Sequence, residues 1–163
     1  MLYIITVIIL LILSCIIIIY KTNKENKYLN KSVSLKESMD LVGLPIITVN
    51  CDTTKLNFLL DTGSNMSQVN TKVLSYIKYK INKDKNSVIG IEGNAKNTDC
   101  CLIDFNYKNQ FFTNTFLIND LSKVFDTIKV EYGVQIHGII GNDFITKYKY
   151  ILDFDKYIAY PKK

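Results

Sequence analysis

The sequence predicts a small, closed, all-β barrel with one or two short helices, preceded by a single transmembrane helix. Its length of 163 residues favours one folded domain. From about residue 41 onward, short apolar runs alternate with turn residues, which is typical of several short strands closing into a barrel. Before that, almost every side chain from Leu2 to Tyr20 is aliphatic, and no charged side chain precedes Lys21. The chain therefore divides into an apolar segment over 1–20, a polar linker over 21–40 and a β domain over 41–163.

The apolar segment is long enough to cross a membrane. A helix that rises about 1.5 Å per residue needs about 20 apolar residues to cross a hydrocarbon layer of about 30 Å. A cleaved signal peptide is the alternative, but the segment has no basic start and no small-x-small cleavage site. A lipoprotein signal at Leu13-Ser14-Cys15 is disfavoured because the apolar run continues past Cys15. We therefore expect a retained, single-pass membrane anchor.

Lysines set the expected orientation of this anchor. Within residues 1–36, every basic side chain follows the apolar segment: Lys21, Lys24, Lys27, Lys31 and Lys36. The positive-inside rule then places the β domain on the cytoplasmic side. The four cysteines (Cys15, Cys51, Cys100 and Cys101) agree weakly with a reducing compartment. They lack metal-type spacing, and adjacent cysteines are poorly placed for a structural disulfide.

Each element of the β domain is expected from its apolar pattern and from the turn residues beside it. Residues 21–40 are rich in Lys, Asn, Ser and Glu without apolar periodicity, which favours a linker. Hairpins are expected around residues 51–54 and 108–110. A short helix can begin at Asn70 or Thr71, and another at Asn142 that runs to Lys147. The expected strands cover residues 44–50, 55–60, 87–91, 101–107, 111–118, 134–140 and 150–160.

One short run carries the chemistry. The apolar run that ends in Leu60 delivers a carboxylate, Asp61, straight into a glycine turn. Glycine allows a tight backbone path beside the carboxylate, and the hydroxyls of Thr62 and Ser64 can form hydrogen bonds around it. Asp-Thr-Gly is also ordinary turn chemistry and occurs by chance in some chains of this length. The apolar strand in front of the motif, and a second signal later in the chain, favour a functional site.

The second signal is the stretch from Ile136 to Asp143, an apolar run with two glycines that opens a short helix. Together the two signals resemble the retroviral-like aspartic proteases, the single-domain, retropepsin-type family. Most of residues 41–160 is covered, so the resemblance implies a small closed aspartic-protease barrel. The similar positions are Asp61, Thr62, Gly63 and Ser64 for the active-site motif, Gly138, Ile139, Ile140 and Gly141 for the strand beside it, and Gly90, Ile91, Glu92 and Gly93 for the flap over the substrate.

The resemblance implies a role for each residue of the first motif. Asp61 would activate a water for attack on a peptide carbonyl and then help pass a proton to the leaving nitrogen. Thr62 would hydrogen-bond across a two-fold axis to brace two active-site loops, and Gly63 would allow the turn. Ser64 would donate a hydrogen bond to the carboxylate, which favours activity at mildly acid pH. The substrate would be an extended peptide with apolar side chains.

This chemistry needs two carboxylates side by side, one acting as base and the other as acid. The chain has a single Asp-Thr-Gly, since Asp126 lacks the following glycine and Asp153 and Asp155 lie in the expected last strand. We therefore expect a C2 homodimer that supplies Asp61 from each copy. The leading hypothesis is a membrane-anchored aspartic endopeptidase. The alternatives are a dimeric binding module with the same fold but weak catalysis, and an anchored structural protein with a chance motif.

The composition argues against several other classes of function. A net charge of +5 is spread along the chain and comes from lysine alone, whereas nucleic-acid surfaces usually cluster arginine. The single histidine, His137, has no Cys or His partners at metal-ligand spacing, so we expect it to be structural. There is no P-loop, no Rossmann glycine pattern and no Gly-x-Ser-x-Gly. We expect neither a metal nor a cofactor.

Overall fold

The structure, a computed structural model, describes residues 6–7, 9–19, 32–89 and 95–162. The chain divides into two compact units, 1–31 and 32–163, and each is described here by itself.

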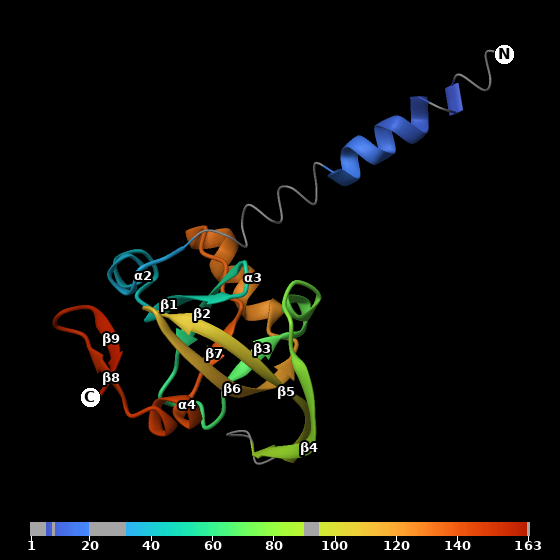
Figure 1. The fold of residues 1–163 in the computed structure, drawn as a ribbon. Coiled ribbons are helices and arrows are strands. Elements are labelled where there is room, and N and C mark those ends of the chain that lie inside the picture. The colour runs from blue at the N-terminus through green and yellow to red at the C-terminus, as the bar shows by residue number, and fades with distance from the viewer. Residues whose placement is uncertain (1–5, 8, 20–31, 90–94, 163) are drawn as a thin grey trace. The chain divides into compact units, whose positions relative to one another are not determined.

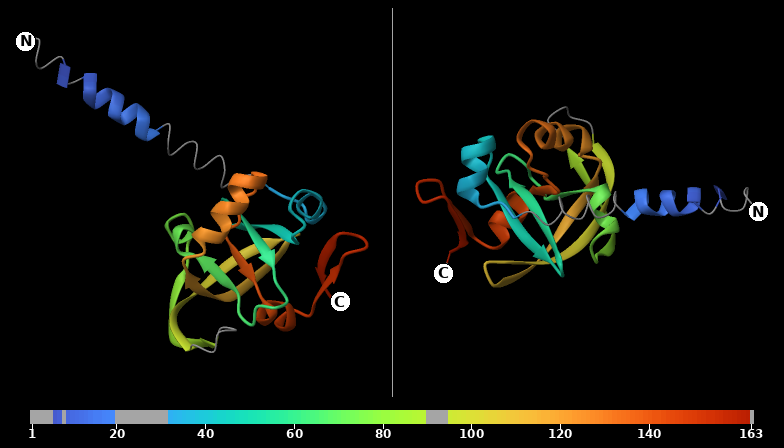
Figure 2. Two further views of the ribbon diagram at one scale, coloured as in Figure 1. Left: turned by 180° about the vertical axis from the view of Figure 1, so that it is seen from behind. Right: turned by 90° about the horizontal axis from the view of Figure 1, so that it is seen from above.

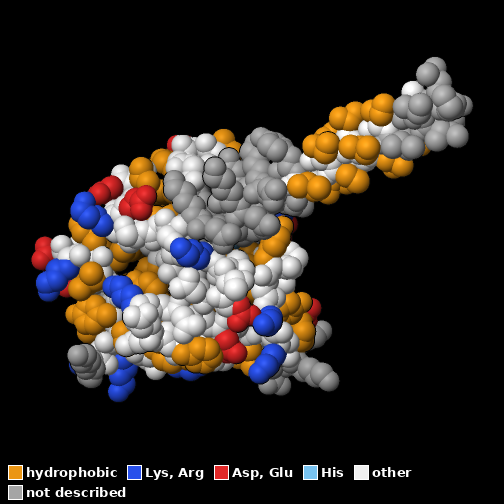
Figure 3. All heavy atoms as spheres, turned by 45° about the horizontal axis from the view of Figure 1, so that its top comes forward, with side chains coloured by type: hydrophobic (Ala, Val, Ile, Leu, Met, Phe, Trp, Pro, Cys, Tyr) orange, Lys and Arg blue, Asp and Glu red, His pale blue; other side chains and the backbone are white. Residues whose placement is uncertain are grey.

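The first unit contains a helix whose described residues are 6–7 and 9–19. Its large apolar side chains are 39% to 66% exposed, and Figure 3 shows them along the helix. Residues 1–5, 8 and 20 of the predicted anchor lie outside the described residues. Within the described ranges, the structure contains no helix with the length and apolar character that a membrane crossing requires.

The second unit is a closed β-barrel (Figures 1 and 2). Six strands form the barrel in the order β1-β2-β7-β3-β6-β5, and β5 returns to β1 through the pair Asn50 and Asn106. A seventh strand, β4, extends the sheet beyond β5, while β8 and β9 form a separate hairpin. The strand bounds are β1 Ile46–Cys51, β2 Thr54–Leu60, β3 Gln68–Asn70, β4 Lys80–Ile89, β5 Ala95–Tyr107, β6 Gln110–Asn119, β7 Gly138–Ile140, β8 Tyr150–Asp153 and β9 Ile158–Pro161.

The described residues of this unit form four short helices, one before β1 and three between strands, which is more than the one or two that the sequence predicted. They are α2 (Leu35–Val42), the 3₁₀-helix η1 (Thr71–Ser75), α3 (Ser122–Tyr132) and α4 (Asn142–Lys147). Both expected helices form, η1 with Asn70 as its N-cap and α4 from Asn142 to Lys147. Neither α2 nor α3 was expected. In α3 the β-branched residues and scattered charges obscure the apolar period, and Phe125 is its one buried residue.

The predicted linker ended at residue 40, whereas the compact unit already begins at Ser32. Ser34 and Glu37 form a capping box that starts α2, and Gly43 ends the helix in the left-handed conformation. Val33 and Leu35 are buried. A single helix of eight residues has too little periodicity to stand out in a polar stretch, which is why the sequence pattern missed it.

The core is rich in phenylalanine. Phe58, Phe105, Phe116 and Phe144 are almost fully buried, and the rings of Phe105 and Phe144 lie 5.6 Å apart. Burying one such side chain contributes about 1.5–3 kcal/mol. A second cluster fills the space under α3 and consists of Val33, Ile46, Phe125, Val134 and Ile136.

Three strand predictions differ from the structure. The segment 134–140 was expected to be one strand, but only Gly138–Ile140 pairs, and the residues before it pack as irregular chain. The segment 150–160 is a hairpin, because the chain turns back at residues 154–157 with Tyr157 at a positive φ of 51°. Of the strand expected at 87–91, residues 87–89 are the end of the ten-residue β4, and residues 90 and 91 lie outside the described residues.

The packing around Gly138 gives a first testable prediction. A Cβ atom at this position would overlap the Phe58 ring and the Gln68 carbonyl oxygen, so Gly138→Ala forces β2, β3 and β7 apart. We expect the free energy of unfolding to fall by about 1–3 kcal/mol. Urea denaturation of the full chain in detergent micelles, followed by near-UV circular dichroism, measures it. In the control Val130→Ala, at a side chain that is 87% exposed, the change should stay within about 0.5 kcal/mol. Equal stability of Gly138→Ala and wild type would contradict the described packing.

Candidate active site

Asp61 lies where two parallel strands end together. β2 pairs with β7 in parallel from Phe58 and Gly138 to Leu60 and Ile140. The next residue on β2 is Asp61, and its backbone N–H donates to the Ile140 carbonyl oxygen at 3.0 Å. The carboxylate is therefore delivered at a fixed point on the barrel, at the start of the loop that connects β2 to β3 (Figure 1).

The loop folds back on the carboxylate as a tight turn. The Gly63 N–H donates to Asp61 Oδ1 at 2.9 Å, and the Ser64 N–H donates to the Asp61 carbonyl oxygen at 3.2 Å. A Cβ on residue 63 would lie 3.2 Å from Asp61 Oδ1, so a larger residue would crowd the carboxylate. Asp61 is partly buried, while Thr62 and Gly63 are exposed. The turn therefore orients one carboxylate oxygen and leaves the group accessible to water or to a second molecule.

Ser64 does not take the position that the resemblance implied. Its Oγ donates to the Met66 carbonyl oxygen at 2.8 Å and accepts from Gln68 Nε2 at 3.4 Å. The hydroxyl thus stabilises the course of the loop and does not touch the carboxylate. The expectation of mildly acid activity, which rested on that hydrogen bond, has no support from this contact.

The second predicted motif lies directly beside the loop, as expected. Gly141 follows β7 and packs so closely that a Cβ there would lie 2.7 Å from the Ser64 carbonyl oxygen. The first residue of α4, Asn142, donates its N–H to that same oxygen at 2.8 Å and its Nδ2 to the Thr62 carbonyl oxygen at 2.6 Å. Gly138–Ile140 and Gly141 therefore bring the start of α4 against the Asp61 turn and fix it from one side.

The sequence reasoning missed a polar cluster that secures the far end of this loop. Asp143 Oδ1 accepts from the Ser67 N–H and from Ser67 Oγ, both at 2.8 Å, and its Oδ2 accepts from Asn114 Nδ2 at 2.8 Å. Ser67 Oγ also accepts the Gly141 N–H at 3.1 Å. The cluster joins the loop, β6 and α4. Its only trace in the sequence is an acidic residue in the first turn of a helix, which is too common a feature to indicate a site.

The flap residues Gly90, Ile91, Glu92 and Gly93 lie outside the described residues. The two arms that lead to them are described. β4 pairs with β5 in antiparallel register from Lys80 and Leu102 to Ile89 and Ala95, with an irregularity between Asn82 and Asn86. Residues 80–89 and 95–107 therefore form a long antiparallel strand pair.

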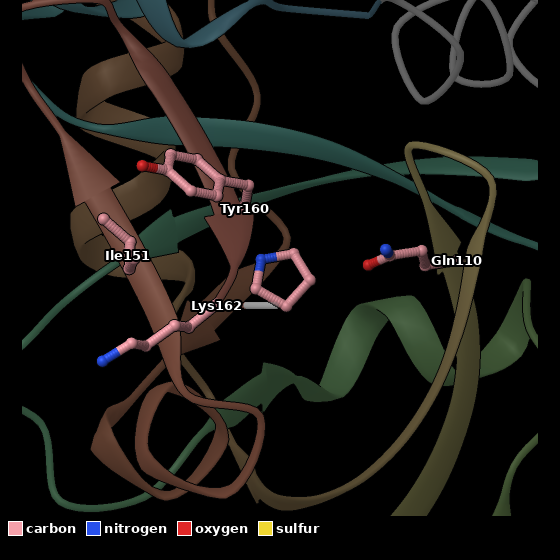
Figure 4. Close-up of a pocket in the computed structure, with 5 residues that line it drawn as sticks. Gln110, Ile151, Tyr160 and Lys162 are labelled. Carbon is pink, nitrogen blue, oxygen red and sulfur yellow. The ribbon is translucent and has the colours of Figure 1, made fainter.

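Other polar and hollow features of the domain lie apart from Asp61. A hollow of about 500 Å³ lies between the start of β6 and the β8–β9 hairpin and is lined by Gln110, Ile151, Tyr160, Pro161 and Lys162. Figure 4 shows these residues as sticks. Burial raises the pKa of the Cys51 and Cys101 thiols to about 12, which keeps them protonated and unreactive. In the described part of the chain, no three His, Cys, Asp or Glu side chains come together as a metal site would require.

Comparison with known proteins gives similarity in solved structures only. No protein-family profile matches the sequence, and no curated protein does. The EIAV protease, solved in complex with the inhibitor HBY-793, aligns with 66% of this chain and 90% of its own at 23% identity, with a TM-score of 0.48. The retroviral protease-like domain of Ddi1 from Leishmania major aligns with 74% of this chain and 89% of its own at 10% identity, with a TM-score of 0.49. Similarity at these identities and TM-scores says nothing about activity, substrate or partners.

The polar cluster around Asp143 predicts that replacing this aspartate lowers stability more than replacing an aspartate on the surface. Asp143→Asn turns one acceptor oxygen into an NH₂ group that faces a donor, so it should lower the free energy of unfolding by about 1–3 kcal/mol. The control is Asp126→Asn on α3, where the carboxylate pairs with Lys72 at 3.4 Å in an exposed position and the loss should stay below about 1 kcal/mol. Thermal or urea unfolding measures both. Equal losses in the two variants would show that the cluster contributes nothing beyond a surface charge.

Proposed function

We propose that this protein is an aspartic endopeptidase that works as a homodimer, with Asp61 of each copy forming the catalytic pair. The observation that carries the proposal is the Asp61 turn itself. A carboxylate directly after a buried strand is held by the Gly63 N–H on one oxygen and stays partly exposed. Aspartic proteases need a carboxylate of this kind, oriented by the backbone and open to water.

The proposed reaction divides two roles between two identical groups. Two carboxylates held about 3 Å apart cannot both carry a charge, so one is protonated and the other is ionised. The ionised group takes a proton from a water whose oxygen attacks the peptide carbonyl carbon. The protonated group stabilises the carbonyl oxygen as it becomes negative, and a proton then passes to the leaving nitrogen as the C–N bond breaks.

The second carboxylate is proposed to come from another copy because Asp61 opens the single Asp-Thr-Gly of the sequence. Asp120 also follows a parallel strand pair and accepts the Ser122 N–H at 3.0 Å, but it is exposed and no glycine follows it. Asp126 lies on α3 and pairs with Lys72, and Asp153 ends β8 and pairs with Lys156 at 3.2 Å. Neither is near the end of a parallel strand pair. A C2 axis beside the exposed Thr62 and Gly63 would bring two Asp61 carboxylates together, with Thr62 in position to brace the two loops.

The proposed substrate is a peptide in extended conformation, bound between the Asp61 pair and the strand pair of β4 and β5. The supporting observation is the length of that strand pair, which consists of Lys80–Ile89 and Ala95–Tyr107 and is continuous with the barrel through β5. An extended peptide satisfies its backbone hydrogen bonds by lying along strands, and its side chains then point alternately to two sides.

We also propose that residues 1–20 anchor the protein to a membrane by a single pass, with the protease domain on the cytoplasmic side. The support is in the sequence: a mostly aliphatic stretch without a charged side chain, followed by lysines. A tethered protease meets substrates near the bilayer more often than substrates elsewhere, because the tether raises their effective concentration.

The catalytic role of Asp61 predicts a loss of cleavage without a loss of fold. Asp61→Asn keeps the shape and the Gly63 contact but removes the proton chemistry, so cleavage of a mixed peptide library should fall by at least about 10³-fold. The full chain in detergent micelles is assayed from pH 4 to 8 by mass spectrometry of the products. The matched control is Asp155→Asn, an exposed aspartate, which should cleave like wild type. Undiminished cleavage by Asp61→Asn would overturn the proposal, and a folded, dimeric wild type without cleavage would favour the binding module.

The two-copy arrangement predicts how activity falls when mutant and wild type are mixed. If wild-type and Asp61→Asn chains are unfolded together at equal concentration and refolded, about one quarter of the dimers carry both aspartates. Activity should therefore fall to about one quarter of that of the wild type at the same total concentration. A fall to one half would indicate that each copy works alone.

The anchor predicts firm attachment to membranes. The expressed full chain should stay in the membrane fraction after washing with alkaline carbonate, whereas a variant that lacks residues 1–20 should be released. The orientation is tested by adding protease to sealed vesicles of known sidedness. Release of the full chain by carbonate would remove the anchor from the proposal and leave the catalytic part unaffected.

A further inference from the structure

The only histidine of the chain occupies an unusual position in the barrel. His137 is 2% exposed and lies immediately before β7. Its Nδ1 accepts the backbone N–H of Asn57 at 2.8 Å, and its own backbone N–H donates to the Asn57 carbonyl oxygen at 2.8 Å. The imidazole therefore takes the place of a backbone acceptor and starts the pairing of β7 with β2, one residue before the Phe58–Gly138 pair.

The other nitrogen of the ring is buried without a partner. His137 Nε2 has no hydrogen-bond partner among the described residues. Since Nδ1 accepts an N–H, the neutral ring carries its proton on Nε2, and this buried donor is unsatisfied. Such a group costs about 1–3 kcal/mol relative to a paired one. Among the described residues, no group accepts a hydrogen bond from Nε2, so none would stabilise the protonated ring at this nitrogen either.

The surroundings of the ring offer no negative charge. Among the described residues, β2 contacts the ring through the Asn57 backbone N–H, and β3 contacts the His137 carbonyl oxygen through the Asn70 backbone N–H. The charged group that acts on the ring is Lys129 of α3. Burial, with a smaller contribution from the positive charge of Lys129, lowers the pKa of His137 to about 4. The Asn57 side chain extends the contact, because its Nδ2 donates to the Gln135 carbonyl oxygen at 2.9 Å.

We infer that His137 is an acid-sensitive latch, whose neutral ring holds β7 against β2 and whose protonation releases this strand pair and with it the support of the Asp61 turn. A protonated imidazole has N–H groups on both nitrogens, so Nδ1 can no longer accept the Asn57 N–H. The cation would also lie in an apolar site without a counter-charge. Both effects act at one end of β7, and at the other end the Ile140 carbonyl oxygen accepts the Asp61 N–H.

The sign of the pH effect follows from proton binding. The unfolded chain binds a proton on His137 below its ordinary pKa of about 6.5, whereas the folded chain binds it only below about 4. The contribution of His137 to stability is therefore complete above about pH 6.5 and is lost as the pH falls toward 4. Across that window the folding equilibrium constant should drop about tenfold per pH unit at most, or about 300-fold in total from this one group.

A direct test follows the single imidazole of the wild-type full chain by NMR in detergent micelles. Since the chain has one histidine, its ring signal needs no assignment. The folded protein should show a neutral ring with its proton on Nε2 down to about pH 5, and protonation should coincide with loss of the slow amide exchange at Asn57 and Ile139. A ring that titrates near 6.5 in a protein that stays folded would overturn the latch.

Two variants separate the latch from general acid unfolding. His137→Asn keeps an acceptor near the position of Nδ1 without titrating, and His137→Leu removes both the acceptor and the titration. Urea unfolding is measured at pH 4.5 and 7.5. Between these two values the folding equilibrium constant of the wild type should fall about 100-fold more than that of either variant. The same pH dependence in all three proteins would assign the effect to other groups and contradict the latch.

The consequence for activity rests on the proposed function, whereas the NMR titration and the urea unfolding do not depend on it. If the protein cleaves peptides, the acid limit of wild-type activity should follow the loss of the folded state, and His137→Asn should extend activity to lower pH. An unchanged acid limit in a folded His137→Asn would contradict this regulatory consequence. A protein that never cleaves, but whose ring behaves as described, would leave the latch standing and remove the function.

Discussion

The parallel pairing of β2 with β7 is the interaction on which the candidate site depends. It joins residues 58–60 to residues 138–140, which are far apart in the chain, and it ends in the hydrogen bond from Asp61 to Ile140. Contacts of such high sequence separation form only after their loop-closure entropy has been overcome. The Asp61 turn therefore cannot be held in place until β7 and α4 have been synthesised and docked. Gly138 and Gly141 are required at this junction because backbone and ring atoms occupy the space that a side chain would need.

The loop around Asp61 is rigid for reasons that have little to do with the carboxylate itself. Its carbonyl oxygens at Thr62 and Ser64 accept from α4, and its far end is secured by the cluster of Asp143, Ser67 and Asn114. Catalytic groups lose rate when their supporting residues allow them to move by a fraction of an ångström. Buried polar groups, which are tolerated only when they are fully paired, thus hold a loop that is itself partly exposed.

The sequence predicted the local parts of this arrangement well and the non-local parts poorly. Both hairpins near in sequence, β1–β2 and β5–β6, and the start of α4 follow from turn residues and caps, which act over a few positions. The helices α2 and α3 and the split of residues 150–160 into β8 and β9 were missed, because short elements with mixed polarity are fixed by packing on the barrel. Asp61 was found because glycine and an apolar strand mark it locally. The partners of Asp143 come from three separate segments, so no local pattern could reveal them.

The proposed aspartate pair and the proposed latch make opposite demands on pH. A pair of Asp61 carboxylates would need one shared proton to work, which favours lower pH. The strand that supports them is held by a neutral imidazole at His137, which favours higher pH. Asp61 and His137 lie at opposite ends of the same short strand pair, β2 and β7. A change in the pH response of one is therefore expected to affect the other. If the proposed pair and the proposed latch both operate, the working pH is bounded above by the need for a shared proton and below by loss of the folded state. Histidine is the one side chain whose ordinary titration range falls between those bounds.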